Sequence, residues 1–182
     1  MTCNLTGNCQ TIDWQGLVDS LADVQGETRT YGVDFYQNTN GQFDEIIKLW
    51  QTAGYDKSGT VEWINYYPGS HFSQDIVAAF EQFTNTKCIR AWVSKIRPGR
   101  YAPYHWDIDD QEEEYLKQGN LVRYTAHPCT PTMGQVLIVE NQAFHMESQG
   151  NVYQWPTHRA WHAGGNCSFT PKYLFNYLGI SK

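Results

Sequence analysis

The stretch Cys88-Ile-Arg-Ala-Trp-Val-Ser-Lys-Ile96 decides the fold class of this chain. It begins a half of the sequence in which short segments rich in β-branched and aromatic residues alternate with glycine and proline. Such segments predict strands, and the glycines and prolines predict the turns between them. The predicted strands cover residues 88–96, 101–108, 121–127, 135–139, 143–147, 151–155, 159–163 and 172–178. Short strands at this spacing predict an antiparallel sandwich or barrel, such as a jelly roll.

The first half of the chain has the periodicity of helices instead. Apolar residues recur three and four positions apart over residues 13–24, from Phe43 to Trp50, and from Phe72 to Phe83. Gly54 suits the left-handed position just past the second helix. Ser70 is the predicted N-cap of the third helix. Residues 60–67 form a short β-prone stretch between these two helices.

The composition fits a single folded domain. The chain has 182 residues, of which 41% are hydrophobic and 15% aromatic, far from the composition of a disordered chain. This length is enough to bury roughly 70% of the unfolded surface in one core. We therefore expect one α+β domain over residues 1–182. Its core would be a double-stranded β-helix (jelly-roll or cupin-like) over residues 88–182, with a mainly helical part, residues 1–87, packed on one sheet.

Charge, hydropathy and cysteine content exclude several classes of protein. The net charge of −6 leaves no basic face for double-stranded nucleic acid or an anionic membrane. The longest uninterrupted apolar run, Ile76–Phe80, is far shorter than the about 20 residues of a spanning helix. The five cysteines include no C-x-x-C pair, which excludes a zinc finger or a disulfide framework. With no secretion-signal pattern at the N-terminus, we expect a cytoplasmic protein with free thiols.

His105 and Asp107 form the first motif that carries chemistry. Residues i and i+2 of a strand project from one face, so these two side chains would point together. An imidazole beside a carboxylate provides two thirds of the 2-His-1-carboxylate triad that holds non-haem Fe(II). Asp107 also begins an acidic run that ends at Glu114, whose other members we expect in a solvated loop or helical turn. The candidates for the third ligand are His127, His145, His158 and His162.

Lys172 is the second residue of chemical interest. It opens the apolar segment Lys172-Tyr-Leu-Phe-Asn-Tyr-Leu178, ten residues after His162. A cation that points into the interior of a β-roll is costly unless an anion meets it. A cosubstrate that carries a carboxylate and chelates the same metal would supply that anion.

Taken together, these residues resemble the Fe(II)/2-oxoglutarate-dependent dioxygenases. The pattern of that superfamily is H-x-D, a distal histidine much later in the chain, and an arginine or lysine shortly after it. Here the pattern is matched by His105 and Asp107, by His162 at 57 residues after His105, and by Lys172. The resemblance implies that His105, Asp107 and His162 bind the metal and that Lys172 binds 2-oxoglutarate.

A finer resemblance is to the aspartyl/asparaginyl β-hydroxylase branch. The segment Ser94-Lys-Ile-Arg-Pro-Gly99 resembles that branch's entry to the first iron ligand, and Arg123-Tyr-Thr-Ala-His127 resembles its Arg-x-x-x-His strand. This resemblance implies that Ser94, Arg123, Thr125 and His127 contribute to the 2-oxoglutarate site. The chain departs from the branch in two ways. It has Asp107, which the branch often lacks, and it has Lys172 in place of arginine, as in prolyl hydroxylases.

The choice of the distal ligand has one alternative. The segment Gly134-Gln-Val-Leu-Ile-Val139 before His145 also looks like the strand that precedes the family's distal histidine. Ten residues beyond His145 is Trp155, which cannot anchor a carboxylate. We therefore favour His162 over His145.

The resemblance implies an enzyme that uses Fe(II), 2-oxoglutarate and O2, releases succinate and CO2, and hydroxylates an unactivated C–H bond. The expected partner is an amino-acid, peptide or protein substrate, which an aromatic rim made of Tyr101, Tyr104, Trp155 and Trp161 would fit. One alternative is a non-catalytic β-roll that binds metal or ligand as an interaction module. Another is a cupin-type metal enzyme without 2-oxoglutarate, which would have no need of Lys172.

Overall fold

The computed structural model describes residues 2–30, 44–107 and 111–181. Its strands are β1 (Asn4–Asn8), β2 (Glu27–Thr30), β3 (Glu62–Tyr66), β4 (Thr86–Ile96), β5 (Arg100–His105), β6 (Leu121–Ala126), β7 (Gln135–Val139), β8 (Gln142–Phe144), β9 (Asn151–Gln154), β10 (His162–Asn166) and β11 (Lys172–Ser181). The helices are α1 (Trp14–Ser20), α2 (Asp44–Thr52), α3 (Gln74–Thr84) and α4 (Glu112–Leu116), with a 3-10 turn, η1 (Tyr55–Lys57).

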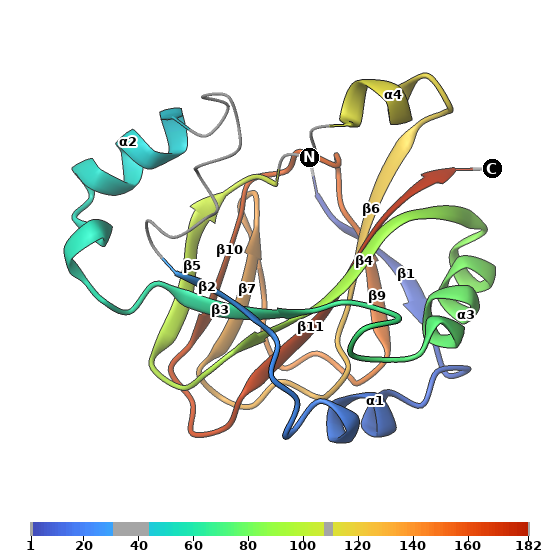
Figure 1. Cartoon of the computed structure of the whole chain (residues 1–182), viewed down its shortest axis with the longest axis horizontal. Coiled ribbons are helices and arrows are strands. Elements are labelled where there is room, and N and C mark those ends of the chain that lie inside the picture. The colour runs from blue at the N-terminus through green and yellow to red at the C-terminus, as the bar shows by residue number, and fades with distance from the viewer. Residues whose placement is uncertain (1, 31–43, 108–110, 182) are drawn as a thin grey trace.

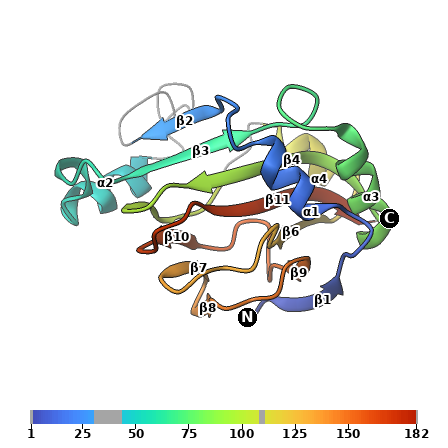
Figure 2. The ribbon, with the colours of Figure 1, turned by 90° about the horizontal axis from the view of Figure 1, so that it is seen from below.

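Two antiparallel sheets form the body of the protein (Figure 1). The larger sheet has the strand order β1-β9-β6-β11-β4-β3-β2, and the smaller has the order β5-β10-β7-β8. Figure 2 shows β3, β4 and β11 lying over β7 and β8, so the sheets face each other as two layers. This is a jelly-roll, cupin-like β-roll with helices added, as the sequence predicts.

Each of the strands predicted in the second half of the chain is present, with its ends moved by a few residues. Two of these shifts concern the site. The predicted strand 101–108 ends at His105, and the predicted strand 159–163 begins only at His162 and continues to Asn166. The first half contributes β1, β2 and β3 to the larger sheet in addition to its helices, and only β3 is predicted from the sequence.

The helices begin and end close to the predicted positions. Gly54 has a φ of 81° directly after α2, where the left-handed conformation ends the segment as predicted. The prediction that Ser70 caps the third helix is wrong. Ser73 caps α3 instead, because its hydroxyl accepts a hydrogen bond from the Asp75 amide at 3.1 Å. Phe43, the first residue of the predicted second helix, lies outside the described residues. No helix in the described ranges is long and apolar enough to cross a membrane.

The alternation of side chains along β11 divides the molecule into an outer and an inner face. Tyr173, Phe175 and Tyr177 point outward and are buried under α1 and α3. Phe175, for example, lies 5.6 Å from the ring of Trp14 and 4.9 Å from that of Phe80. The alternate residues, from Lys172 to Leu178, point inward toward the smaller sheet. The largest apolar cluster therefore lies between the larger sheet and the helices α1 and α3, and two smaller apolar clusters, which include Leu174 and Ile96, share the interior of the roll with polar side chains.

Register along the larger sheet orders the inner face into rows. Lys172 pairs with Ile96, Leu174 with Ser94, and Asn176 with Trp92, while Leu178 lies between Arg90 on β4 and Arg123 on β6. Lys172 and Leu178 are thus six residues apart on one face, about 20 Å along the strand. We call the Lys172 side, with His127 and Gly164, the deep end, and the Leu178 side, with Arg90, Trp92 and Leu121, the mouth.

Candidate metal centre

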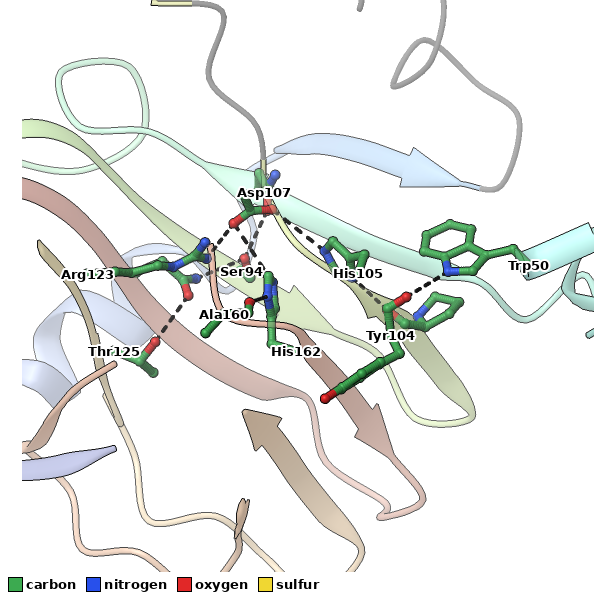
Figure 3. Close-up of polar contacts among 12 residues, drawn as sticks. Trp50, Ser94, Tyr104, His105, Asp107, Arg123, Thr125, Ala160 and His162 are labelled. Atoms are coloured by element: carbon green, nitrogen blue, oxygen red, sulfur yellow. Dashed lines mark hydrogen bonds and ion pairs between the residues drawn. The ribbon is translucent and has the colours of Figure 1, made fainter. Parts of the chain in front are cut away.

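His105, Asp107 and His162 converge on one point of the inner face (Figure 3). One candidate ligand atom from each lies within 4.8 Å of the other two. His105 ends β5 and His162 begins β10, and the two residues are direct partners in the register of these strands. The Nε2 atom of His105 is 3.6 Å from Oδ1 of Asp107, and Nε2 of His162 is 3.8 Å from Oδ2. Asp107 lies beyond the end of β5, so strand alternation alone does not place its carboxylate there.

Backbone carbonyls fix the orientation of both imidazoles. Nδ1 of His105 donates to the carbonyl of Pro103 at 2.6 Å, and Nδ1 of His162 donates to that of Ala160 at 3.1 Å. A carbonyl can only accept, so Nδ1 carries the proton and the neutral ring directs its Nε2 lone pair toward Asp107. Burial lowers the pKa of His105 and of His162, which keeps both rings neutral. Neutral imidazoles held by a backbone acceptor are in the form that binds a metal.

Arg123 holds the carboxylate in place. Its guanidinium is buried and forms an ion pair with Oδ2 of Asp107. It also lies over the ring of Trp155, 4.0 Å from the centroid. Burial by itself raises the pKa of Asp107, but the charge of Arg123 outweighs it and holds this pKa well below its usual range. The carboxylate is therefore ionised. Arg123, which the resemblance assigns to 2-oxoglutarate, instead contacts the carboxylate of the metal centre.

Lys172 and His127 are two buried polar residues at the deep end. Lys172 is 2% exposed, and its ammonium donates to the carbonyl of Val136. No carboxylate in the described ranges pairs with it, and burial lowers its pKa to about 7. His127 is 1% exposed, and neither of its ring nitrogens has a hydrogen-bond partner in this part of the chain. Burial and the charge of Lys172 lower the pKa of His127 to about 3. Buried polar groups without partners indicate a ligand that would satisfy them.

Ser94 and Thr125 belong to a polar ladder across four strands of the larger sheet. Ser94 donates to Asn65 at 3.0 Å and accepts a hydrogen bond from Asn176 at 3.1 Å, while Thr125 donates to Asn176 at 3.4 Å. The ladder lies on the inner face, between the deep end and Arg123. Asn65 and Asn176 are not predicted from the sequence. A signal was available for Asn176, since it is the only uncharged polar residue in the apolar segment 172–178.

The other histidine candidates lie apart from the metal centre. His145 is exposed beyond β8. His158 contacts Glu112 at 2.8 Å. Glu113 and Glu114 are exposed in the short helix α4, as the prediction of a solvated loop or helical turn expects, whereas Glu112 is buried and paired with Arg159. Asp109 and Asp110 of that run lie outside the described residues.

The predicted aromatic rim is only partly at the surface. Tyr104 stacks on Trp161, with ring centroids 5.3 Å apart, and 39% of Tyr104 is exposed. Trp155, in contrast, is 4% exposed and packs edge-on against His162 at 4.7 Å. Trp155 is therefore a wall of the metal centre and not part of a rim.

No family model and no curated protein matches the sequence. Among solved structures, the chain is similar to a viral collagen prolyl hydroxylase from Paramecium bursaria chlorella virus 1, described as a 2OG complex, with 16% identity over 76% of this chain and 89% of that chain and a TM-score of 0.45. It is also similar to a predicted oxalate decarboxylase from Thermotoga maritima, with 11% identity over 65% of this chain and 81% of that one and a TM-score of 0.40. A cupin domain from Bordetella pertussis gives 14% identity, 51% and 81% coverage, and a TM-score of 0.34.

Proposed function

We propose that this protein is an Fe(II)- and 2-oxoglutarate-dependent dioxygenase that hydroxylates an unactivated C–H bond of an amino-acid or peptidyl side chain. One observation carries the proposal: the inner face holds a His-Asp-His cluster and, deeper, a buried lysine without an anionic partner among the described residues. The cluster would bind a metal ion. The lysine would pair with an anionic cosubstrate bound next to that metal.

The donor set fits iron. Two neutral imidazoles and one ionised carboxylate are the donors of the facial triad of non-haem Fe(II) oxygenases, which leaves the remaining coordination positions open. His105, Asp107 and His162 would hold the ion. When bound, iron would allow O2 to oxidise 2-oxoglutarate to succinate and CO2 and to hydroxylate the substrate C–H bond, with one oxygen atom going to each product.

The position of Lys172 fits the far carboxylate of 2-oxoglutarate. Gly164 lies two residues beyond His162 on β10, about 7 Å along the same face. A Cβ at Gly164 would be only 3.3 Å from Nζ of Lys172, so the ammonium lies directly over this glycine. A dicarboxylate with one end at the metal centre would therefore reach Lys172 with the other. His127, whose nitrogens lack partners, lies close enough for the charge of Lys172 to affect its pKa and would contact the same ligand.

Other residues orient the ligands and exclude water. Arg123 fixes Oδ2 of Asp107 and keeps the carboxylate ionised. Trp63 stacks on His105 and Trp155 packs on His162, with ring centroids 5.8 Å and 4.7 Å apart. These apolar walls leave the imidazoles little freedom to turn. The protein's part in catalysis is thus to hold the donors, bind the cosubstrate and keep the site dry.

The test is anaerobic reconstitution with Fe(II), followed by O2 and 2-oxoglutarate, with succinate measured without any prime substrate. We expect the wild-type protein to bind iron and to form succinate slowly. The variant His105→Ala should lose both properties, because only two donors remain. The matched control is His145→Ala, which removes the rejected ligand candidate and should retain both. Full iron content and an unchanged rate in His105→Ala would overturn the assignment. Iron binding without succinate in the wild-type protein would favour a non-catalytic module.

A further inference from the structure

A cavity of about 30 Å³ lies beside the metal centre, at the mouth of the roll. Asp107 and Arg123 form one wall, and Arg90, Trp92, Leu121 and Leu178 form others. Arg90, Leu178 and Arg123 are register partners on three adjacent strands, so their side chains leave the same face of the sheet side by side. The cavity is therefore on the opposite side of the metal centre from Lys172, where it cannot serve the same carboxylate.

Arg90 brings an unbalanced positive charge to this cavity. Its guanidinium carbon lies 5.2 Å from the ring centroid of Trp92 and 5.9 Å from that of Tyr67, so two aromatic side chains hold it in position. It forms no ion pair with any acidic residue in the described ranges. Arg123, by contrast, is balanced by Asp107. The charge of Glu112, which also lines the cavity, is balanced by Arg159.

The remaining chemistry of the cavity indicates the class of ligand. The planar guanidinium of arginine matches a carboxylate or phosphate with two parallel hydrogen bonds. Because Asp107 and Glu112 are each paired with an arginine, Arg90 contributes a single unbalanced positive charge, which matches a singly charged carboxylate better than a doubly charged phosphate. Trp92, Leu121 and Leu178 provide an apolar wall for the rest of the molecule.

From these observations we propose that Arg90 binds the carboxylate of the substrate, and that the substrate is a small carboxylic acid with an apolar body. This inference rests on the proposed function, because it assigns the substrate class of the same site. The apolar body would lie between Arg90 and Asp107, so a C–H bond in it faces the metal centre. Arg90 is a specificity-determining residue in this arrangement, and Lys172 serves the cosubstrate alone.

Binding of a matched pair of probes to the metal-free protein tests the proposal. The probes are 4-methylpentanoate and its uncharged amide, followed by ligand-observed NMR. We expect the acid to bind at least tenfold more tightly than the amide. The variant Arg90→Gln should weaken binding of the acid at least tenfold. Arg97→Gln, which removes an exposed arginine paired with Glu62, and Lys172→Met should leave binding of the acid unchanged. Leucine and N-acetyl-leucine then distinguish a free amino acid from a peptide C-terminus.

Three outcomes would overturn the proposal: no binding of the acid, equal binding of acid and amide, or unaltered binding of the acid by Arg90→Gln. Loss of binding in Lys172→Met would also do so, because it would place the acid at the deep end. The proposed function is judged separately by succinate formation. A wild-type protein that binds the acid through Arg90 but forms no succinate would overturn the function and leave the anion subsite in place.

Discussion

The deep end and the mouth of the roll each present a cation, but in opposite physical states. Lys172 is almost fully buried and lacks an anionic partner among the described residues, so burial lowers its pKa to about 7. Arg90 is exposed, and it is held over the rings of Trp92 and Tyr67. Pairing with an anion stabilises a buried ammonium strongly. It stabilises a solvated guanidinium less, but the planar guanidinium selects anions by their geometry. Under the proposed function, the deep end would provide affinity for the cosubstrate and the mouth would provide choice among substrates.

Removing the buried charge should give the largest effect. In Lys172→Met we expect 2-oxoglutarate affinity to fall by roughly 150- to 5000-fold, since breaking a buried ion pair costs about 3–5 kcal/mol. The ligand-free protein should become more stable, because an unpaired buried charge is replaced by an apolar chain of similar length. Calorimetric titration and urea unfolding measure the two effects. Lys87→Met, on the exposed side of β4, is the control. Unchanged 2-oxoglutarate affinity in Lys172→Met would refute the role of the deep end.

The next largest effect should be a change in 2-oxoglutarate affinity with pH, by up to about tenfold per pH unit. The pKa of Lys172 in the folded, ligand-free protein is lowered from 10.5 to about 7, so above pH 7 the ammonium must take up a proton before it can pair with the ligand. Affinity should therefore fall as pH rises above 7. His127, the titratable group that faces Lys172 from β6, has a pKa of about 3 and contributes nothing in this range. Lys172→Arg should make the profile flat, and a flat profile in the wild-type protein would contradict the assignment.

The same shift predicts how the stability of the ligand-free protein depends on pH. Between pH 10.5 and about 7 the unfolded chain binds a proton at Lys172 that the folded protein does not. Stability contributed by this group therefore declines as pH falls through that range and is constant below it. Unfolding free energies of wild-type and Lys172→Met protein should diverge toward pH 7 and converge toward pH 10.5.

A smaller effect should come from adding one methyl group at the deep end. A Cβ at Gly164 would lie 3.0 Å from Cδ1 of Ile96 and 3.3 Å from Nζ of Lys172, so the two side-chain ends must move. In Gly164→Ala we expect 2-oxoglutarate affinity to fall about fivefold, as for about 1 kcal/mol of overpacking. Gly165→Ala is a close control, because a Cβ there would have ordinary contacts at 3.6 Å or more. Equal affinities in the two variants would show that the ammonium does not depend on this space.

The sequence alone predicts the features of the fold and the site that depend on local patterns. Strand periodicity locates the β-roll, and the spacing of His105, Asp107, His162 and Lys172 identifies the side chains that converge on its inner face. The strand prediction succeeds because it depends on residues close in the chain. The choice of His162 and Lys172 rested instead on the resemblance to a known superfamily, and the structure confirms only that His162 lies beside His105 and Asp107. The alternation argument for Asp107 has the wrong premise, since β5 ends two residues earlier.

Features that depend on distant pairing could not be predicted. β1 has the polar sequence Asn4-Leu-Thr-Gly-Asn8, which carries no alternation, and it forms only because β9 offers an edge. The contact of Arg123 with Asp107 joins β6 to the end of β5, and no spacing rule relates the two. No pattern in the sequence distinguishes Arg90 from an ordinary surface arginine. Its position on the wall of the cavity at the mouth follows only from the pairing of β4 with β11.

The direct pairing of His105 with His162 across β5 and β10 would link the proposed metal binding to the folding of the chain. Because side chains alternate along a strand, sliding either strand by one residue would send one imidazole to the opposite face. A metal ion that requires both would bind the correctly aligned strands and leave the slipped ones unoccupied. Bound metal would therefore stabilise the native alignment selectively. The ion would favour the correct strand register during folding, before any chemistry takes place.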